Sequence, residues 1–591
     1  MRGSDKPAGE VAQVVRIGSH HCAHDIEPMT TSEGTQANPH PGGATTSIWQ
    51  STCEVPRFPK LTKSGSADVC VIGAGIAGLS VAYHLARDGK KVVVLDDGPI
   101  GGGETGRTTA HLTNAMDDRI YWLEQVHGEH GAQLTVGSHG AAINRIQQIV
   151  QLEGIDCDFE RLDGYLMSRN PADATELEKE AEAANRAGLT DVSLVDRAPI
   201  AAFESGVALR FPGQAQFHAL KYLAGLATAI TEKYGGRIYC DTHVEGVEGG
   251  DPCNVKVAGG LQLSASCVCV CTNSSISDYV RTHVKSEADR TYVIAAAVPR
   301  GSVDKALYWD TGMPYHYVRT QHIESSYVTD EAKLTGSIDR GTAPTKGEIL
   351  WDALIVGGED HKVGHDSSPE DRWNVLELWM RARWPQASAV LWRWSGQVVE
   401  PSDGLGYIGR NPDGAENVFM AMGDSGQGMT HGTIAGILLS DLVLGRENPW
   451  ATLYDPKRTS LRAEPLKEAV KHNLDVVVQM AKGYLAPDTY NVDDIPRGEG
   501  RVVRRGAKKV AVYRDEEGKL HEKSAACTHL KCIVEWNGAE KSWDCPCHGS
   551  RFDAYGEVLN GPAISALQDV ESESGSGGSS GGRSRTRKVK A

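Results

Sequence analysis

Two short strings near the C-terminus combine thiol and imidazole groups at a spacing suited to metal binding. The first is Cys-Thr-His-Leu-Lys-Cys over residues 527–532, and the second is Cys-Pro-Cys-His-Gly-Ser over residues 545–550. Two thiolates and two imidazoles can hold a tetrahedral Zn²⁺ or, alternatively, a sulfide-bridged iron pair. The candidate ligands are one Cys and one His from each string: Cys527, His529, Cys545 and His548.

The order of the ligands along the chain separates these two alternatives. Zinc fingers usually group Cys with Cys and His with His, whereas each string here mixes the two types. Both strings resemble the Rieske [2Fe–2S] family almost letter for letter, including Gly549-Ser550 and the 15 residues, 530 to 544, between the ligand pairs. That resemblance implies two Cys on one iron and two His on the other, with a disulfide between Cys532 and Cys547. A Rieske cluster is therefore expected, with structural zinc as the alternative.

A second motif lies near residue 70 and has the pattern of a dinucleotide-binding turn. Gly73-Ala-Gly75-Ile-Ala-Gly78 follows the apolar run 68–72 and opens a helix to about residue 88. A second apolar run, 91–95, ends at Asp96, 21 residues beyond Gly75. In this context Gly73 permits the tight turn, Gly75 admits the pyrophosphate, Gly78 allows close packing, and Asp96 reaches the ribose. A nicotinamide or a flavin dinucleotide would satisfy this much.

Four further motifs resemble the D-amino-acid oxidase family of FAD-dependent oxidoreductases, which includes glycine oxidase and sarcosine oxidase. They cover 101–111, 394–396, 403–409 and 423–432, so the resemblance extends over about residues 66–460. It implies FAD as the cofactor, with Arg107 and Thr108 near the pyrophosphate or ribityl chain. It also implies a Gly-rich turn and helix start at the pyrimidine end of the flavin, made by Gly426, Gly428, Met429 and Thr430.

Three side chains are candidates for catalysis, and each has a structural alternative. His111 follows the first flavin motif, and some relatives attach FAD covalently through a His in this region. Arg319 occupies a strand whose counterpart in glycine oxidase carries a carboxylate-binding Arg, and a bidentate Arg suits an amino-acid carboxylate. The alternative for Arg319 is a surface or structural Arg. His361 follows an apolar strand beside Asp360, and a satisfied loop residue is the favoured interpretation over a residue that lines the site.

Composition limits the classes of function that need to be considered. The chain has 591 residues, a net charge of −16 and 40% hydrophobic residues, which suits a soluble globular protein and argues against nucleic-acid binding. No apolar run is long enough for a membrane span, and no secretory signal is visible, so a cytoplasmic protein is expected. Cys267, Cys269 and Cys271 alternate with Val and predict one face of a buried strand. Translation could begin at Met1 or Met29.

The pattern of elements predicts the domain organisation. Residues 1–65 are predicted to be a disordered polar extension, and 66–460 an α/β, glutathione-reductase-like FAD domain interleaved with an α+β substrate domain. An amphipathic helical connector is predicted over 461–483, with Leu466, Val470, Leu474, Val477 and Val478 on its apolar stripe. A small all-β Rieske domain follows over 484–570, and 571–591 is a disordered basic Gly/Ser tail.

Taken together, these features predict an FAD- and [2Fe–2S]-dependent oxidoreductase. The favoured function is oxidation of a small amine or amino acid by hydride transfer to FAD, with electrons passing singly through the cluster to an external acceptor protein. One alternative reverses the flow, so that a donor protein feeds the cluster and the flavin reduces or hydroxylates a substrate. Another is an electron-transfer or redox-sensing protein that has no small substrate.

Overall fold

The computed structural model describes most of the chain between residues 43 and 570. The description leaves out 1–42, 171–173, 202, 275, 277–281, 283–284, 329–349, 367, 460–462, 486–490, 507 and 571–591, together with the side chains of 463–472. The predicted disorder of residues 1–42 and of the tail 571–591 therefore lies outside the described residues.

A mixed sheet with a parallel centre supports the dinucleotide-binding turn. Its strand order is β16-β17-β10-β1-β2-β7, and β10, β1, β2 and their neighbours β17 and β7 pair in parallel. The antiparallel strands β8 and β9 extend from β10. The strands are β1 (Gly65–Ile72), β2 (Val92–Leu95), β7 (Arg237–Tyr239), β8 (Val244–Glu248), β9 (Cys253–Val257), β10 (Leu261–Asn273), β16 (Tyr407–Arg410) and β17 (Val418–Met422).

Strand β10 confirms the interpretation of its three alternating cysteines. Cys267, Cys269 and Cys271 are buried in the core between the sheet and its helices, while Val268 and Val270 are buried in a separate core on the other face. Both faces of the strand are therefore covered, as is typical of a parallel sheet.

Helices cover one face of this sheet and pack closely on one another. Helices α2 and α8 are in contact because glycines of α8 leave no side chain between them: a Cβ on Gly432 would lie 2.6 Å from Ile76 Cγ2, and one on Gly436 2.5 Å from Ser80 Cβ. The helices associated with this core are α2 (Ile76–Arg87), α3 (Ile120–Glu153, with non-helical backbone at Gly128), α5 (Ala219–Thr228), η2 (Ala229–Lys233) and α8 (Gly428–Val443).

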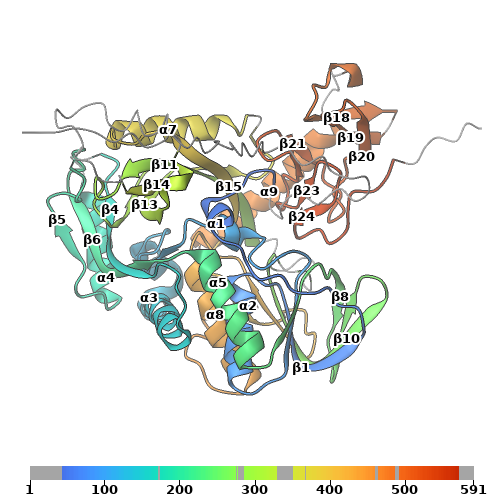
Figure 1. Cartoon of the computed structure of the whole chain (residues 1–591), viewed down its shortest axis with the longest axis horizontal. Coiled ribbons are helices and arrows are strands. Elements are labelled where there is room, and N and C mark those ends of the chain that lie inside the picture. Colours follow the sequence, from blue (N-terminus) through green and yellow to red (C-terminus); the bar gives the residue numbers. More distant parts are fainter. Residues whose placement is uncertain are drawn as a thin grey trace, which may run out of the picture. The chain divides into compact units, whose positions relative to one another are not determined.

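A second, largely antiparallel sheet forms the predicted substrate domain. The chain moves repeatedly between the two sheets, which confirms the interleaved arrangement, and α7 covers one face of the second sheet (Figure 1). The strands are β3 (His111–Leu112), β4 (Glu160–Met167), β5 (Ser193–Val195), β6 (Ala208–Gln216), β11 (Ser286–Pro299), β12 (Leu307–Asp310), β13 (His316–Ile323), β14 (Trp351–Lys362) and β15 (Val390–Pro401). The helices are η1 (Glu104–Arg107), α4 (Thr175–Arg186), η4 (Ser325–Tyr327) and α7 (Asp371–Arg383).

The C-terminal region consists of small antiparallel sheets, as predicted. One contains β18 (Glu499–Arg505), β19 (Lys508–Arg514) and β20 (Leu520–Ser524). The other contains β21 (Glu535–Asn537), β22 (Ser542–Asp544), β23 (Arg551–Asp553) and β24 (Val558–Asn560), and the short helix η5 (Val492–Asp494) precedes both sheets.

Helix α9 (Ala463–Leu485) joins the two halves of the chain, but its packed face differs from the predicted stripe. Leu474, Val477 and Val478 are 62%, 63% and 47% exposed, whereas Val476 and Met480 pack on the C-terminal core. Leu466 and Val470 lie outside the described side chains. The hydrophobic spacing located the helix, but it did not identify the side that the neighbouring domain covers.

The ordered chain begins earlier than the sequence predicts. Helix α1 (Ile48–Thr52) lies within the segment expected to be disordered, yet Ser47, Ile48 and Trp49 are fully buried. The Ser47 hydroxyl donates to the Gly106 carbonyl, and Trp49 Nε1 donates to that of Thr108. This segment therefore supports residues 106 and 108 of the first flavin motif.

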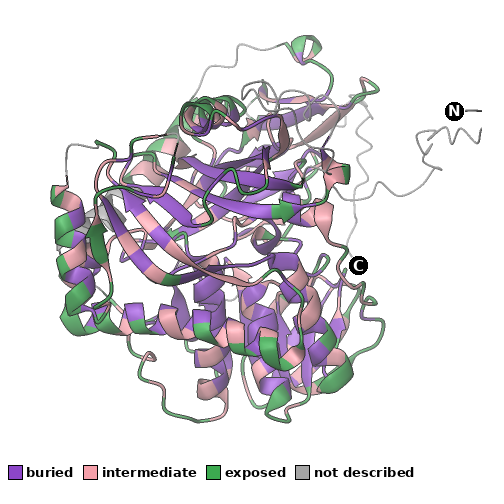
Figure 2. Cartoon of the chain, turned by 60° about the vertical axis from the view of Figure 1, so that its left-hand side comes forward, coloured by how far each residue is buried: buried purple, intermediate pink, exposed green. Residues whose placement is uncertain are grey.

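Figure 2 shows the general pattern of burial, with buried residues concentrated in the sheets and exposed ones on the outer faces of helices.

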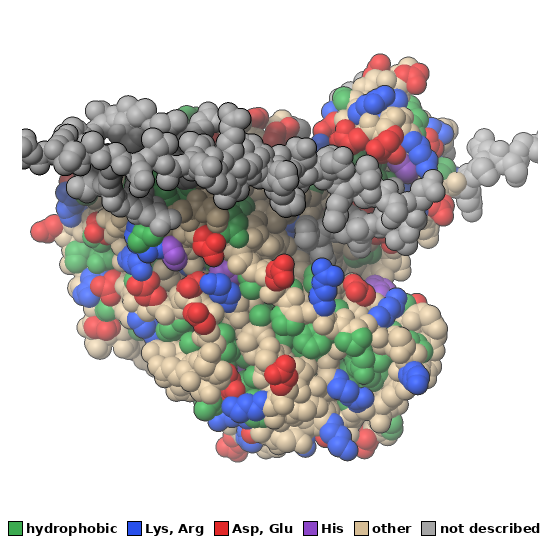
Figure 3. Space-filling view, viewed as in Figure 1, with side chains coloured by type: hydrophobic (Ala, Val, Ile, Leu, Met, Phe, Trp, Pro, Cys, Tyr) green, Lys and Arg blue, Asp and Glu red, His purple; other side chains and the backbone are tan. Residues whose placement is uncertain are grey.

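Within the described part of the chain, no helix combines the length and apolar character required to cross a bilayer. Acidic and basic side chains are interspersed over the face seen in Figure 3.

Candidate active site and metal centre

Each glycine of the first motif has a separate geometric reason. Gly73 has φ +102° and faces the Cys271 carbonyl, so a side chain there would meet backbone. Gly75 is the N-cap of α2, and Gly78 packs on the carbonyl of Gly73. The turn therefore brings the N-terminus of α2 close to the sheet, as a pyrophosphate site requires.

Asp96 lies at the end of β2, beside this turn. Its Oδ1 accepts a hydrogen bond from Gly98 N at 2.8 Å, and its Oδ2 accepts one from Ala74 N. Burial, together with the neighbouring Asp97, raises the pKa of Asp96 to about 7. The carboxyl faces the cavity at the position where the fingerprint places a ribose.

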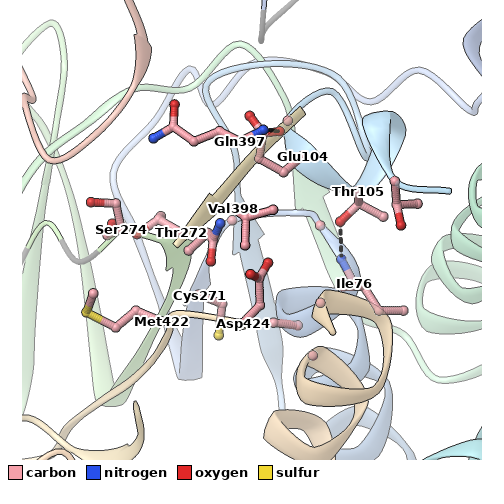
Figure 4. A pocket seen from close by; sticks show the side chains of 18 of the residues that line it. Ile76, Glu104, Thr105, Cys271, Thr272, Ser274, Gln397, Val398, Met422 and Asp424 are labelled. Carbon is pink, nitrogen blue, oxygen red and sulfur yellow. Dashed lines mark hydrogen bonds between the residues drawn. The ribbon is translucent and has the colours of Figure 1, made fainter. Parts of the chain in front are cut away.

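A cavity of about 340 Å³ runs from the first turn to the start of α8 (Figure 4). Thr105 lies at its phosphate end and accepts a hydrogen bond from Ile76 N at 3.1 Å. The predicted cofactor residues that line the cavity are Gly73, Gly75, Asp96, Arg107, Thr108, Gly426, Gly428, Met429 and Thr430. Gly78 does not line the cavity. It packs on the Gly73 carbonyl, so it allows α2 to approach the turn closely.

Buried polar atoms in the cavity wall test whether FAD fits. Within the described residues, Gln397 Oε1 and Asp424 Oδ1 are buried without a hydrogen-bond partner, and both side chains line the cavity. Unsatisfied buried acceptors are costly unless a ligand brings donors. The hydroxyl and N–H groups of a flavin dinucleotide would meet this need, so the residues fit FAD.

The second Gly-rich turn lines the same cavity. Gly426 has φ +76°, and α8 begins at Gly428, directly after Gln427. The free N–H groups and positive end of this helix therefore face the cavity.

His111 lines the cavity near this end. Its Nδ1 lies 3.0 Å from Thr109 Oγ1 and its Nε2 3.4 Å from the Val318 carbonyl. Burial, and secondly the charge of Arg319, lowers the pKa of His111 to about 3. The imidazole is therefore neutral at physiological pH.

The other two catalytic candidates do not line the cavity. Arg319 is fully buried and donates to the carbonyls of Thr109, Ala110 and Phe217. It therefore supports the chain segment around His111 and does not face the cavity. His361 lies on β14, and its Nε2 is 3.0 Å from the hydroxyl of Tyr292 on β11. Tyr292 belongs to the hydrophobic core that α7 covers.

Sequence reasoning missed several lining residues at the flavin-turn end. Asp117, Thr291, Trp309, Tyr315 and Tyr317 all face the cavity. The alternation Tyr315-His-Tyr317 was a detectable signal for two aromatic side chains on one face of a strand. Nothing in the local sequence of Asp117 marks it as a cavity residue.

The predicted cluster ligands converge in the C-terminal core. The Cys527 and Cys545 thiols are buried and in contact, and the His529 and His548 rings lie 5.1 Å apart. The Cys545 thiol lowers the pKa of Cys527 to about 7, so one of the two readily becomes a thiolate. A pair of adjacent thiols and a pair of adjacent imidazoles match the donors of a Rieske centre, so the residues fit the cluster.

Two neighbouring features complete this centre. Cys532 and Cys547 form a disulfide, and the Cys545 sulfur lies within 4.8 Å of both their sulfurs. The Ser550 hydroxyl accepts a hydrogen bond from Ala563 N at 3.0 Å and also contacts Cys527. The disulfide therefore joins the two ligand loops, as the family resemblance implies.

A buried ion cluster joins the C-terminal region to the flavin region. Glu540 Oε1 lies 3.2 Å from Arg107 Nη1 and 3.2 Å from Arg290 Nη2, and the side chains of both pairs are 0% exposed. Burial alone would raise the pKa of Glu540, but Arg107 and Arg290 outweigh it and hold the pKa at about 2. Arg107 therefore faces this carboxylate, and the Ser395 hydroxyl donates to the same oxygen.

The C-terminal region also forms part of the cavity wall. Asn560 Nδ2 donates to Glu104 Oε1 at 2.8 Å, and His243 Nε2 lies 3.2 Å from the Ile564 carbonyl. Gly561 packs against Ser274. The wall residues from this region are Val558, Leu559, Asn560, Gly561, Ala563 and Ile564.

The side chain of Gln397 connects this cavity to the loop that contains His548. Gln397 lines the cavity, and its Nε2 donates to the Gly549 carbonyl at 2.9 Å. Gly549 directly follows the predicted ligand His548 and packs against Ala288 of β11. The ligand loop therefore rests on the strands that carry the flavin cavity.

Comparison with known proteins agrees with this geometry. The family model described as FAD dependent oxidoreductase matches residues 68–442, and the Rieske [2Fe-2S] domain model matches 487–571. The Bacillus subtilis protein YhfW, named as a Rieske 2Fe-2S iron-sulfur protein, is 31% identical over 88% of this chain and 97% of its own length. The gamma-glutamylputrescine oxidoreductase of Escherichia coli is 27% identical over 66% of this chain and 86% of its own length.

Solved structures share the fold of the larger region. The glycine oxidase of Geobacillus kaustophilus aligns with a TM-score of 0.51 at 18% identity, covering 67% of this chain and 99% of that one. The fold, the two cofactor sites and the family matches lead to one conclusion. This chain belongs to the FAD dependent oxidoreductase family and carries a C-terminal Rieske [2Fe-2S] domain.

Proposed function

We propose that the protein oxidises a small amine or amino acid and passes the electrons singly to an external acceptor protein. When bound, FAD accepts two electrons as a hydride, and a Rieske cluster relays electrons one at a time. The family matches and the amine named for the Escherichia coli relative support this class of substrate.

We assign the cofactor residues as the sequence predicts. The turn 73–78 with Asp96 holds the adenosine and pyrophosphate, and the turn 426–430 holds the pyrimidine end of the flavin. Cys527, His529, Cys545 and His548 ligate the cluster. The division follows from this: a flavin and substrate body over 66–460, the connecting helix, and a Rieske domain over 484–570.

The observation that carries the proposal is the link through Gln397. This side chain lines the flavin cavity and donates to the carbonyl that directly follows the cluster ligand His548. The ion cluster of Glu540 with Arg107 and Arg290 holds the same two regions together. A one-electron centre held this way is suited to draining electrons from the cavity without a large domain movement.

The residues of the cavity also suit oxidation of an amine. His111 is neutral, so it does not repel a cationic substrate. Trp309, Tyr315 and Tyr317 form an aromatic wall that helps to exclude water.

Anaerobic mixing of the holoprotein with candidate amines tests this function. We expect bleaching of the oxidised flavin absorbance, followed by loss of the oxidised cluster absorbance. In the Gln397→Ala variant the first phase should remain while the second slows.

Other outcomes would reject parts of the proposal. Bleaching only by a reduced ferredoxin-like donor would establish the reverse direction of flow. Hydrogen peroxide formed in proportion to substrate, with no cluster reduction, would show direct oxidation by O₂. Absence of any amine-dependent bleaching would favour an electron-transfer protein with no small substrate.

A further inference from the structure

Carboxyl groups gather at the flavin-turn end of the cavity. Asp117 lines the cavity, and Asp360 lies on β14 in contact with Thr291, another lining residue. Burial, followed by the charge of Asp118, raises the pKa of Asp117 to about 7. Burial, followed by the charges of nearby carboxylates that include Asp117, raises the pKa of Asp360 to about 7. Glu400 of β15 lies close enough to Asp117 and Asp360 for their charges to raise its pKa, so it adds a further carboxyl to the group.

The position of these acids relative to the flavin turn is well defined. A Cβ on Gly426 would lie 2.5 Å from Asp117 Oδ2 and 3.7 Å from the Tyr315 hydroxyl. The Asp117 carboxyl also contacts the side chains of Gln427 and Tyr315. The acid group therefore begins directly beside the turn that holds the flavin.

Aromatic rings share this recess. The Tyr315 and Tyr317 rings lie 5.4 Å apart, and the Tyr317 hydroxyl lies 2.6 Å from Thr291 Oγ1. Aromatic faces beside carboxylates form the common protein environment for ammonium groups, because both attract positive charge.

Two buried oxygens point to a ligand that supplies N–H donors. Gln427 is only 6% exposed, lines the cavity and contacts Asp117, yet its Oε1 has no hydrogen-bond partner among the described residues. Asp360 Oδ1 is likewise buried without a partner within the described part of the chain. Buried acceptors of this kind require a donor from a ligand.

The protein's own cations do not meet this need. Arg119 directs Nη1 to the backbone carbonyl of Asp117 and Nε to Glu176. Among the described lining residues the Lys and Arg types are represented by Arg107, whose guanidinium is engaged by Glu540. A substrate carboxylate would therefore meet several acids and no available cation.

We propose that the substrate is an amine that carries a second, remote ammonium group and no carboxylate, as a linear diamine does. This inference rests on the proposed oxidation of an amine. The remote ammonium binds between Asp117 and Asp360 and against the faces of Tyr315 and Tyr317. The reacting nitrogen is the other amine, in its neutral form, at the flavin.

The chemistry balances with FAD as the oxidant. The C–H bond next to the reacting nitrogen breaks and its hydride, with two electrons, passes to FAD. A C=N bond forms as the nitrogen loses one proton to solvent. The products are an imine and reduced FAD, which the acceptor protein reoxidises.

Ligand titration of the oxidised holoprotein under anaerobic conditions tests the recess. The probes are 1,4-diaminobutane, 1-aminobutane and 4-aminobutanoate, and the readouts are perturbation and bleaching of the flavin absorbance. We expect the diamine to bind about tenfold or more tightly than the monoamine, and the amino acid to bind most weakly. Asp117→Asn and Asp360→Asn should each remove most of this preference, while the exposed control Asp191→Asn should keep it.

Flavin content and thermal unfolding show whether each variant is folded. Asp360→Asn tests the recess independently of the flavin turn, because Asp360 is not in contact with Gly426. Tighter binding of 4-aminobutanoate than of the diamine, or an unchanged preference in both variants, overturns the inference. Bleaching by the monoamine or the amino acid but not by the diamine leaves amine oxidation standing and rejects the recess. Asp117-dependent binding of the diamine with no bleaching by any probe supports the recess and rejects the proposed oxidation.

Discussion

At the scale of single residues, Glu540 is central to the contact between the C-terminal region and the flavin region. Its carboxylate is fully buried between Arg107 and Arg290 and also accepts from Ser395. Removal of one partner from a buried ion pair leaves the other charges uncompensated, which costs far more than the pair itself contributes. The carboxylate is therefore required because the two arginines are buried with it.

The substitution Glu540→Gln should lower the stability of the protein by about 3–5 kcal/mol, since it leaves Arg107 and Arg290 buried without an anion. The expected result is a lower midpoint of thermal unfolding, followed by flavin fluorescence. Glu557→Gln, at an exposed position of the same domain, is the matched control and should change little. Equal midpoints for the two variants would contradict this role.

At Asp360, in contrast to Glu540, removal of the carboxyl group is expected to raise the stability of the protein at pH 8. Its pKa is raised in the folded state from 3.8 to about 7, first by burial. The folded state therefore holds a proton that the unfolded state has lost between these pH values, so stability falls as pH rises from about 4 to about 7.

Asp360→Asn abolishes this loss. The variant should be more stable than the wild type at pH 8 and equal to it near pH 4, as measured by denaturant unfolding at each pH. Asp191→Asn should show no such pH dependence. A constant difference at all pH values would mean that Asp360 is already ionised in the folded protein.

At the scale of elements, the contact of α2 with α8 positions both flavin turns at once. The first turn leads into α2 and the second into α8, so the distance between the helices sets the distance between the turns. Gly432 and Gly436 allow this close approach.

A methyl group at Gly436 would meet Ser80, so Gly436→Ala should destabilise the protein by about 1–3 kcal/mol through overpacking. It should also weaken FAD retention, as measured by release of flavin fluorescence on dilution. Gly137→Ala is the control within a helix, because Gly137 of α3 is exposed and has open space around its Cα. That change should be neutral or stabilising by about 0.5–1 kcal/mol.

Local patterns were sufficient for the elements that contain their own signal. The glycine turn, the buried cysteine strand β10 and the ligand strings could be predicted because their chemistry or periodicity lies within a few residues. Burial of Trp49 and exposure of Leu474 could not, because both depend on what another domain covers. The same reason hides Asp117 and the pairing of Arg107 with Glu540, which are 433 residues apart in the chain.

At the scale of the whole molecule, the two cofactor regions share a wall. Residues 558–561, 563 and 564 of the C-terminal region line the flavin cavity, and Asn560 donates a hydrogen bond to Glu104. FAD therefore enters or leaves the cavity past this segment or after the segment has moved.

The substitution Asn560→Ala should speed FAD release severalfold, since it removes the hydrogen bond that fixes this segment over the cavity. The rate of FAD release is measured by stopped-flow dilution, with flavin fluorescence as the readout. Asn448→Ala, which removes a hydrogen bond to Asp441 away from the cavity, is the control. Equal release rates in the two variants would show that the segment does not retain the flavin.

The anion at position 540 also limits how such a protein can be recombined. A Rieske module transplanted from another protein would bring its own residue to this contact, and an apolar or basic one would leave two guanidinium groups stranded in a dry interface. The two regions of this protein therefore cannot be exchanged freely with those of other proteins. A functional chimera would need an acidic residue at position 540 or the replacement of both Arg107 and Arg290.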